Sequence, residues 1–191
     1  MDKDLEKLKE DKEFLKELEE KRDEALKKGD IVLLYDVLDT YLVLDKDEDI
    51  DTIYQRILEI AFDRLADMLT KGEVFDLSKE EDLQVARAIY EHALERWDRN
   101  DFKGSNELFL ILSYIIPDEK IQEGMFLALG ATAKKISLDE FINSFIDIKN
   151  LDENSLFFDR FTKKAKDFLE DEKDLINKEL KKIQKIAKGA K

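Results

Sequence analysis

The residue types that carry most metal and enzyme chemistry are rare in this chain, or lack the spacing that such chemistry needs. The chain has one histidine, His92, and no cysteine. Glu91 and Glu95 flank His92 on a predicted helix, a set that would suit a carboxylate-rich metal site. A di-iron helical bundle, however, needs paired Glu-x-x-His motifs, and the sequence contains none. We therefore predict a packed or hydrogen-bonded imidazole at His92, and no metal site.

Four aspartates alternate over residues 45–51, directly before a predicted helix. A calcium loop of the EF-hand type needs a glycine near its middle and a bidentate glutamate at its end. Ile50 and Arg56 stand at those two positions. We therefore expect an acidic turn between two helices, with Asp51 near the start of the second helix, where negative charge is favourable.

Motifs for other chemistry are also missing from the sequence. It has no glycine-rich phosphate loop, no serine-hydrolase elbow and no zinc motif. Asp and Glu together number 47, so no pair of carboxylates stands out as a general acid and base. Catalysis is not excluded by this pattern, but the prediction is a protein that is not an enzyme and uses no cofactor.

The formal net charge of −14 restricts the partners of this chain. Such an acidic surface repels phosphate backbones, so we do not expect nucleic-acid binding. The N-terminal run is charged and has no apolar core, so we expect no signal peptide. The longest nearly uncharged stretch, Leu108 to Pro117, is too short to cross a bilayer, which predicts no membrane insertion. We expect a cytoplasmic protein.

The composition predicts an all-α fold. The chain has one proline, six glycines and 42% charged residues, and its apolar residues recur every three or four positions. Turn signals divide it into a charged N-terminal helix (1–28), a helical hairpin packing on the core (29–77), a helical core (78–158) and a C-terminal helix (159–191). The N-terminal helix is either an exposed helix leaning on the core or a dimerisation arm.

The core begins with a regular pattern of helix, turn, helix, turn and helix over residues 83–137. Apolar residues on the first helix follow spacings of 3, 4, 3 and 4, and they are Leu83, Ala86, Tyr90, Ala93 and Trp97. Asn100 suits the left-handed end of that helix, and Pro117 ends the next one. Ser78 opens a capping box ahead of the first helix. We expect the C-terminal helix to begin near Phe157 and to break near Asp171.

A tetratricopeptide pattern fits part of this core. That repeat has a period of about 34 residues, with small, aromatic and proline positions at fixed offsets. With Ala93 at the small position of the first helix, Ser105 falls on the small position of the second, Phe109 on its aromatic position and Pro117 on its closing proline. The pattern predicts antiparallel helical hairpins of an α-α superhelix, with extra N-terminal helices and a C-terminal helix, rather than a generic helical bundle.

Residues 78–158 resemble the class II type III secretion chaperones, a family of acidic, all-α tetratricopeptide proteins. The resemblance rests on Tyr90-x-x-Ala93-Leu94-x-x-Trp97-x-x-Asn100-Asp101-Phe102 and on the run from Phe126 to Ala131. It implies a chaperone that holds an extended segment of a hydrophobic, secreted translocator protein in a concave groove. The groove residues would be Arg87, Tyr90, Leu94 and Trp97, continued by Gly124, Leu127, Ala131 and Lys134.

Two alternatives remain beside the groove chaperone. Tyr90 and Trp97 would be strong anchors for a partner if they are exposed, since aromatic side chains bury a large area at low entropy cost. If the N-terminal helices cover them instead, they belong to the core. The second functional interpretation is a non-enzymatic scaffold or assembly adaptor that forms a homodimer through residues 2–28.

Overall fold

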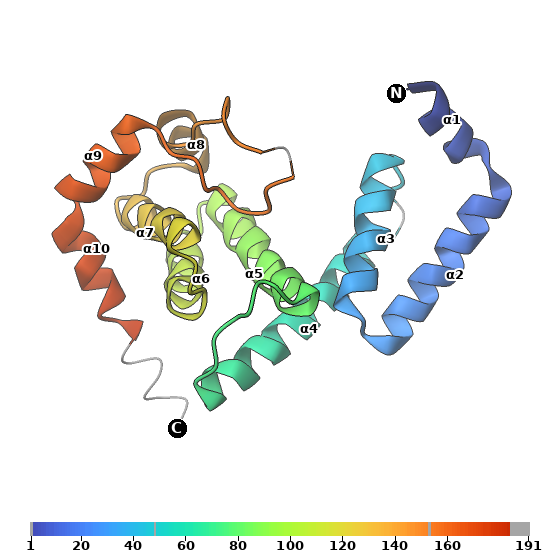
Figure 1. The fold of residues 1–191 in the computed structure, drawn as a ribbon, viewed down its shortest axis with the longest axis horizontal. Helices are drawn as coiled ribbons and strands as arrows, with labels where there is room; N and C mark the ends of the chain where they lie inside the picture. Colours follow the sequence, from blue (N-terminus) through green and yellow to red (C-terminus); the bar gives the residue numbers. More distant parts are fainter. Residues whose placement is uncertain (1, 48, 153, 184–191) are drawn as a thin grey trace.

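The computed structural model of the chain describes residues 2–47, 49–152 and 154–183 (Figure 1). These residues are all-helical, as predicted, with one isolated antiparallel bridge and no strand. The helices are α1 (Asp2–Glu10), α2 (Lys12–Lys28), α3 (Ile31–Val43), α4 (Ile50–Lys71), α5 (Glu80–Asp98), α6 (Phe102–Ile115), α7 (Glu119–Ala133), α8 (Leu138–Phe145), α9 (Lys163–Asp171) and α10 (Lys173–Leu180).

The charged N-terminal segment forms two helices rather than the one predicted over residues 1–28. Asp11 interrupts it, because its side chain accepts hydrogen bonds from the amides of Glu13 and Phe14 at 3.0 and 3.1 Å and so caps α2. α2 ends at Gly29 with φ +66°, and Asp30 caps α3 in the same way. The stop and start predicted at this turn are thus confirmed. In Figure 1, α2 lies alongside α3.

The middle of the chain joins these helices to the core. α3 packs on both α4 and α5. α4 ends at Gly72, which takes the left-handed conformation with φ +70°. The capping box predicted at Ser78 is wrong, because Lys79 is the N-cap of α5 and makes no side-chain cap. The Ser78 hydroxyl instead donates to a carboxylate oxygen of Asp76 at 2.6 Å.

The α5–α6 hairpin forms where the sequence placed it. Asn100 has φ +62° in the turn, and α6 ends at Ile115, two residues before Pro117. Ser105 is fully buried, and its hydroxyl donates to the carbonyl oxygen of Ala93 at 2.8 Å. The two small residues therefore meet where the helices cross, and their size allows the close approach.

The C-terminal part departs from the prediction of a helix that begins near Phe157. Residues 155–161 contain no helix, and α9 begins at Lys163, where the Thr162 side chain accepts a hydrogen bond from the amide of Ala165. An antiparallel bridge pairs Ile146 with Phe161, which holds this segment against the end of α8. The predicted break near Asp171 is present between α9 and α10. Across the described residues, no helix has the length and apolar character that a membrane crossing would require.

Enlarging Ala93 tests the close crossing of α5 and α6. Ala93→Leu adds a bulky side chain at a fully buried position, and overpacking of this kind costs about 1–3 kcal/mol. We expect the free energy of unfolding, measured by urea denaturation, to fall by that amount. Ala66→Leu makes the same change on the exposed face of α4 and should stay within about 0.5 kcal/mol of wild type. Equal effects of the two substitutions would contradict the crossing.

Candidate functional site

The predicted groove residues of α5 and α7 are mostly inside the protein. Exposure falls to 5% for Tyr90 and 1% for Trp97, and Leu127 and Ala131 are fully buried. Leu94 is half-buried, and Lys134 is exposed and ion-paired with Glu172. These residues therefore do not line a groove open to solvent, because other parts of the chain cover most of them.

Trp97 belongs to the core between α5, α6 and α8. Its indole nitrogen donates to the carbonyl oxygen of Ile136 at 2.8 Å. Its ring centroid lies 5.7 Å from that of Phe109 and 4.7 Å from that of Phe141. With its polar atom bonded and its faces covered, Trp97 cannot anchor a partner without unpacking these helices.

Arg87 faces the N-terminal helices instead. Its guanidinium makes a two-pronged hydrogen bond to Asp39 of α3, at 2.7 and 2.8 Å, and a third bond to Glu91 at 2.8 Å. The guanidinium also lies 4.0 Å from the ring centre of Tyr35. Burial lowers the pKa of Arg87, but its hydrogen bonds to Asp39 and Glu91 outweigh that effect and raise it. Arg87 thus joins α5 to α3 and does not continue the surface around Tyr90.

Tyr90 is covered by the C-terminal part of the chain rather than by the N-terminal helices. Its ring centroid lies 5.1 Å from that of Phe157, in an edge-to-face arrangement. Its hydroxyl oxygen accepts a hydrogen bond from the backbone amide of Phe158 at 3.3 Å. Burial raises the pKa of the Tyr90 phenol well above its ordinary value. We call the covering segment, residues 155–161, the strap.

The strap crosses α7 at a glycine. A Cβ added to Gly124 would lie 2.8 Å from the carbonyl oxygen of Phe158 and 3.1 Å from the ring of Phe161, so only glycine fits beneath the strap. The end of the strap is fixed to α8, because the amide of Asp147 donates to the carbonyl of Arg160 and the amide of Thr162 donates to that of Phe145, both at 2.9 Å. Of the predicted groove residues, Tyr90 and Gly124 therefore both lie beneath the strap.

Sequence reasoning missed the strap, although signals for it were present. Phe157, Phe158 and Phe161 have the spacing of an apolar helix face, which concealed their extended conformation. Thr162 is the useful signal, because a threonine before a charged helical run is a good N-cap and places the helix start after the phenylalanines.

The residues considered for metal chemistry have other roles. The Nδ1 atom of His92 lies 3.0 Å from a carboxylate oxygen of Glu95, and its ring packs edge-on against Phe62 at 5.8 Å, as predicted for a packed imidazole. In the acidic turn, Asp45 pairs with Lys9 and Asp49 pairs with Arg22. Throughout the described part of the chain, no cluster of three or more histidine and carboxylate side chains could hold a metal ion.

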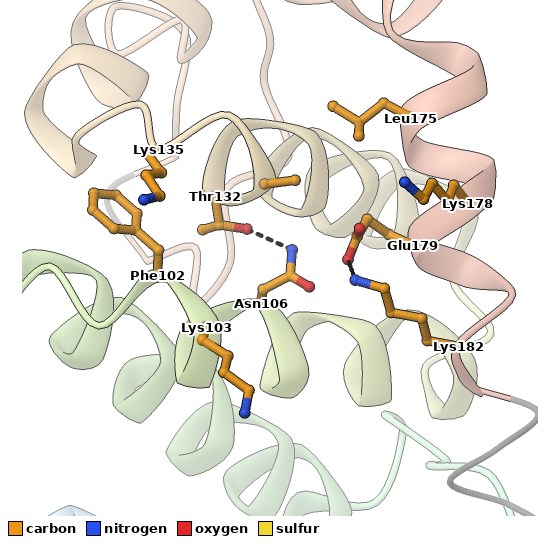
Figure 2. Close-up of a pocket in the computed structure, with 10 residues that line it drawn as sticks. Phe102, Lys103, Asn106, Thr132, Lys135, Leu175, Lys178, Glu179 and Lys182 are labelled. Carbon is orange, nitrogen blue, oxygen red and sulfur yellow. Dashed lines mark hydrogen bonds and ion pairs between the residues drawn. The ribbon is translucent and has the colours of Figure 1, made fainter.

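A separate hollow of about 380 Å³ opens between α6, α7 and α10 (Figure 2). Lysines are its most frequent residue type. We call it the lysine pocket, and its lining consists of Phe102, Lys103, Asn106, Thr132, Ala133, Lys135, Leu175, Lys178, Glu179 and Lys182.

Comparison of the chain with protein-family models, with curated proteins and with solved structures gives no match.

The contact between the strap and α7 can be tested with a glycine substitution. Alanine normally stabilises a helix by about 0.5–1 kcal/mol relative to glycine. In Gly124→Ala the new Cβ meets the backbone oxygen of Phe158, and we expect the free energy of unfolding to fall by about 1–2 kcal/mol.

Gly104→Ala is the matched control, because the atoms nearest to its Cβ belong to the flexible Arg96 side chain, which can move away at the cost of its exposed ion pair with Asp101. That variant should be neutral or up to about 1 kcal/mol more stable. Urea denaturation of both proteins gives the comparison, and stabilisation by Gly124→Ala would contradict the close contact.

Proposed function

We propose that this protein is a non-enzymatic binding module that holds an extended apolar segment of a partner protein. In this proposal α5 to α8 form tetratricopeptide-like antiparallel hairpins, and the binding surface is the part of α5 and α7 around Tyr90 and Gly124. The observation that supports it is that an extended, phenylalanine-rich segment of the chain itself already lies on this surface. The resemblance to secretion chaperones suggests a cytoplasmic setting and a hydrophobic, secreted partner.

The surface beneath the strap offers contacts that any extended peptide can use. The Tyr90 hydroxyl accepts a hydrogen bond from a backbone amide, which is independent of the side chain at that position. Gly124 lets a backbone carbonyl approach α7 closely. The edge-to-face contact of Tyr90 with Phe157 adds a preference for aromatic side chains. Main-chain contacts would thus supply affinity, and aromatic contacts would supply selectivity.

The strap has features of a segment that a partner can replace. Phe158 and Phe161 remain half-buried rather than fully enclosed. One carboxylate oxygen of Asp159 is buried without a hydrogen-bond partner among the described residues. An unsatisfied buried acceptor costs about 1–3 kcal/mol, so the strap binds less tightly than its apolar contacts alone would allow. A partner without such a group would compete with it.

Competition in trans tests this function. The probe is a fluorescein-labelled peptide with the sequence of residues 154–163, added to the full chain and followed by anisotropy. In wild type the tethered strap competes at high effective concentration, so we expect weak binding. Phe158→Ser weakens the strap by removing about 0.75–1.5 kcal/mol of apolar burial, half of what a fully buried phenylalanine contributes, and peptide affinity should rise about three- to tenfold.

Phe14→Ser is the control, since Phe14 is also half-buried but lies on α2. It should leave peptide affinity at the wild-type level, with circular dichroism confirming that each variant is folded. Adding Tyr90→Phe to Phe158→Ser should lower affinity severalfold, because the peptide amide loses its acceptor. If Phe158→Ser does not raise affinity while staying folded, the surface is not a peptide-binding site.

A second candidate function, a dimeric scaffold, is favoured by exposed apolar residues near the N-terminus. Leu8 is 40% exposed, Leu42 53% and Val43 60%. A hollow of about 260 Å³ lies between α1 and α3, and its lining includes Leu5, Leu8 and Val43. A grouped apolar surface of this kind is typical of an interface.

Sedimentation velocity tests the scaffold function. If this surface joins two chains, Val43→Gln removes apolar contact from its centre and should raise the dimer dissociation constant at least about tenfold. Val74→Gln alters a residue that is 53% exposed in the linker before α5, and it should leave the dimer intact. A wild-type chain that stays monomeric at high micromolar concentration would eliminate this function.

A further inference from the structure

The lysine pocket concentrates positive charge on an otherwise acidic protein. The chain carries a net charge of −14, yet four lysines and a single glutamate line this hollow. Lys182 pairs with Glu179, and Lys103 is 3.8 Å from Glu107 with its side chain 88% exposed. Lys135 and Lys178 form no ion pair with any described residue. A concave surface lined by one sign of charge focuses the field and attracts an oppositely charged ligand.

The floor of the pocket is built from buried polar groups. Asn106 is 8% exposed, and its amide nitrogen donates to the carbonyl oxygen of Leu129 at 3.0 Å and to the hydroxyl of Thr132 at 2.8 Å. The Thr132 hydroxyl is itself a donor to the carbonyl of Ala128 at 2.7 Å, so it can only accept from Asn106. Both amide hydrogens of Asn106 are thus used, and the network fixes which side-chain atom is nitrogen.

This network leaves one acceptor of the floor available. Figure 2 shows the oxygen of Asn106 directed away from Thr132, toward the space in front of α10. It accepts no hydrogen bond from the described residues. Glu179 on α10 is 6% exposed and lies across the same space. One of its carboxylate oxygens accepts a hydrogen bond from the Lys182 ammonium. The floor therefore presents acceptors, and Lys178 presents an ammonium donor at the α10 end of the rim.

We propose that the lysine pocket binds a small organic anion that also carries a hydroxyl group, either a phosphate ester or a hydroxycarboxylate. Figure 2 places Lys178 and Leu175 together on α10, at the opposite end of the hollow from Lys135 and Phe102. The anionic group meets Lys178, the carbon skeleton lies against Leu175, and the hydroxyl donates to the Asn106 oxygen. Glu179 disfavours a bare anion deep in the pocket, so the ligand enters hydroxyl first.

Four probes separate the requirement for an anionic group from the requirement for a hydroxyl group. Glycerol 3-phosphate and malate carry both an anionic group and a hydroxyl, inorganic phosphate carries charge without a carbon-bound hydroxyl, and glycerol carries hydroxyls without charge. In titrations of the full ¹⁵N-labelled chain followed by NMR, we expect saturable shifts of the Asn106 side-chain amide and of Lys178 with at least one of the first two probes. That probe should bind at least about fivefold more tightly than inorganic phosphate, and glycerol should not bind.

Matched variants then assign the site. Lys135→Gln/Lys178→Gln should weaken binding at least about tenfold, because the charge-assisted contact of Lys178 is lost together with the positive charge of Lys135 in the same hollow. Lys163→Gln/Lys166→Gln changes the net charge equally at exposed positions on α9 and should leave affinity unchanged. The proposal is overturned if neither glycerol 3-phosphate nor malate shifts the pocket residues, if inorganic phosphate binds equally well, or if both double variants weaken binding alike. None of these results depends on the strap, so the proposed peptide binding stands or falls separately.

Discussion

The packing of α5 is the constraint on which most of this structure depends. It contacts α3, α4, α6 and α8, so nearly every face of one helix must match a different neighbour. Alanines at 86, 88 and 93 are fully buried and allow the neighbouring helices to come close. On the side toward α3, Arg87 replaces apolar packing with a network to Asp39 and Glu91. The Arg87 side chain is 12% exposed but that of Asp39 is 48% exposed, so the ion pair itself contributes little free energy, and its two-pronged geometry serves to orient α3 against α5.

The strap follows from what this arrangement leaves uncovered. Once α5 has its helical neighbours, the surface around Tyr90 and Gly124 is still apolar, and α8 is too short to cover it. A helix would hold its side chains too far from α7 to use the gap above Gly124, whereas an extended chain brings its carbonyl into close contact there. The same geometry that makes the strap fit would admit another extended chain. Under the proposed function, intramolecular cover and partner binding would therefore be two uses of one surface.

Local signals explain how much of the fold could be predicted from the sequence. Gly29, Gly72, Asn100 and Pro117 act through their own backbone preferences, so the turns at these residues are where the pattern placed them. The break at Asp11 was missed because its cap competes with a continuous charged helix by only a small free-energy difference. The burial of Tyr90 and Trp97 could not be predicted, since helical spacing gives one apolar face the same pattern whether a partner or the chain itself covers it. Only the tertiary contact decides that. The strap residue bonded to Tyr90 lies 68 positions later in the sequence, and Ile136, which accepts the hydrogen bond of Trp97, lies 39 positions later.

Part of the positive charge of the lysine pocket has a structural reason. Lys178 is in the last turn of α10, where a cation complements the helix dipole. Helix stability does not require a concave surface, however. Lys135 ends α7 in the left-handed position of a helix terminus, with its amide and that of Ile136 bonded back to Thr132 and Ala131, so its φ of +57° does not mark a ligand site. Helix stability does not account for a buried asparagine whose amide hydrogens are both used while its oxygen faces the hollow. Asn106, rather than the lysine content of the helix ends, is the feature that points to a ligand.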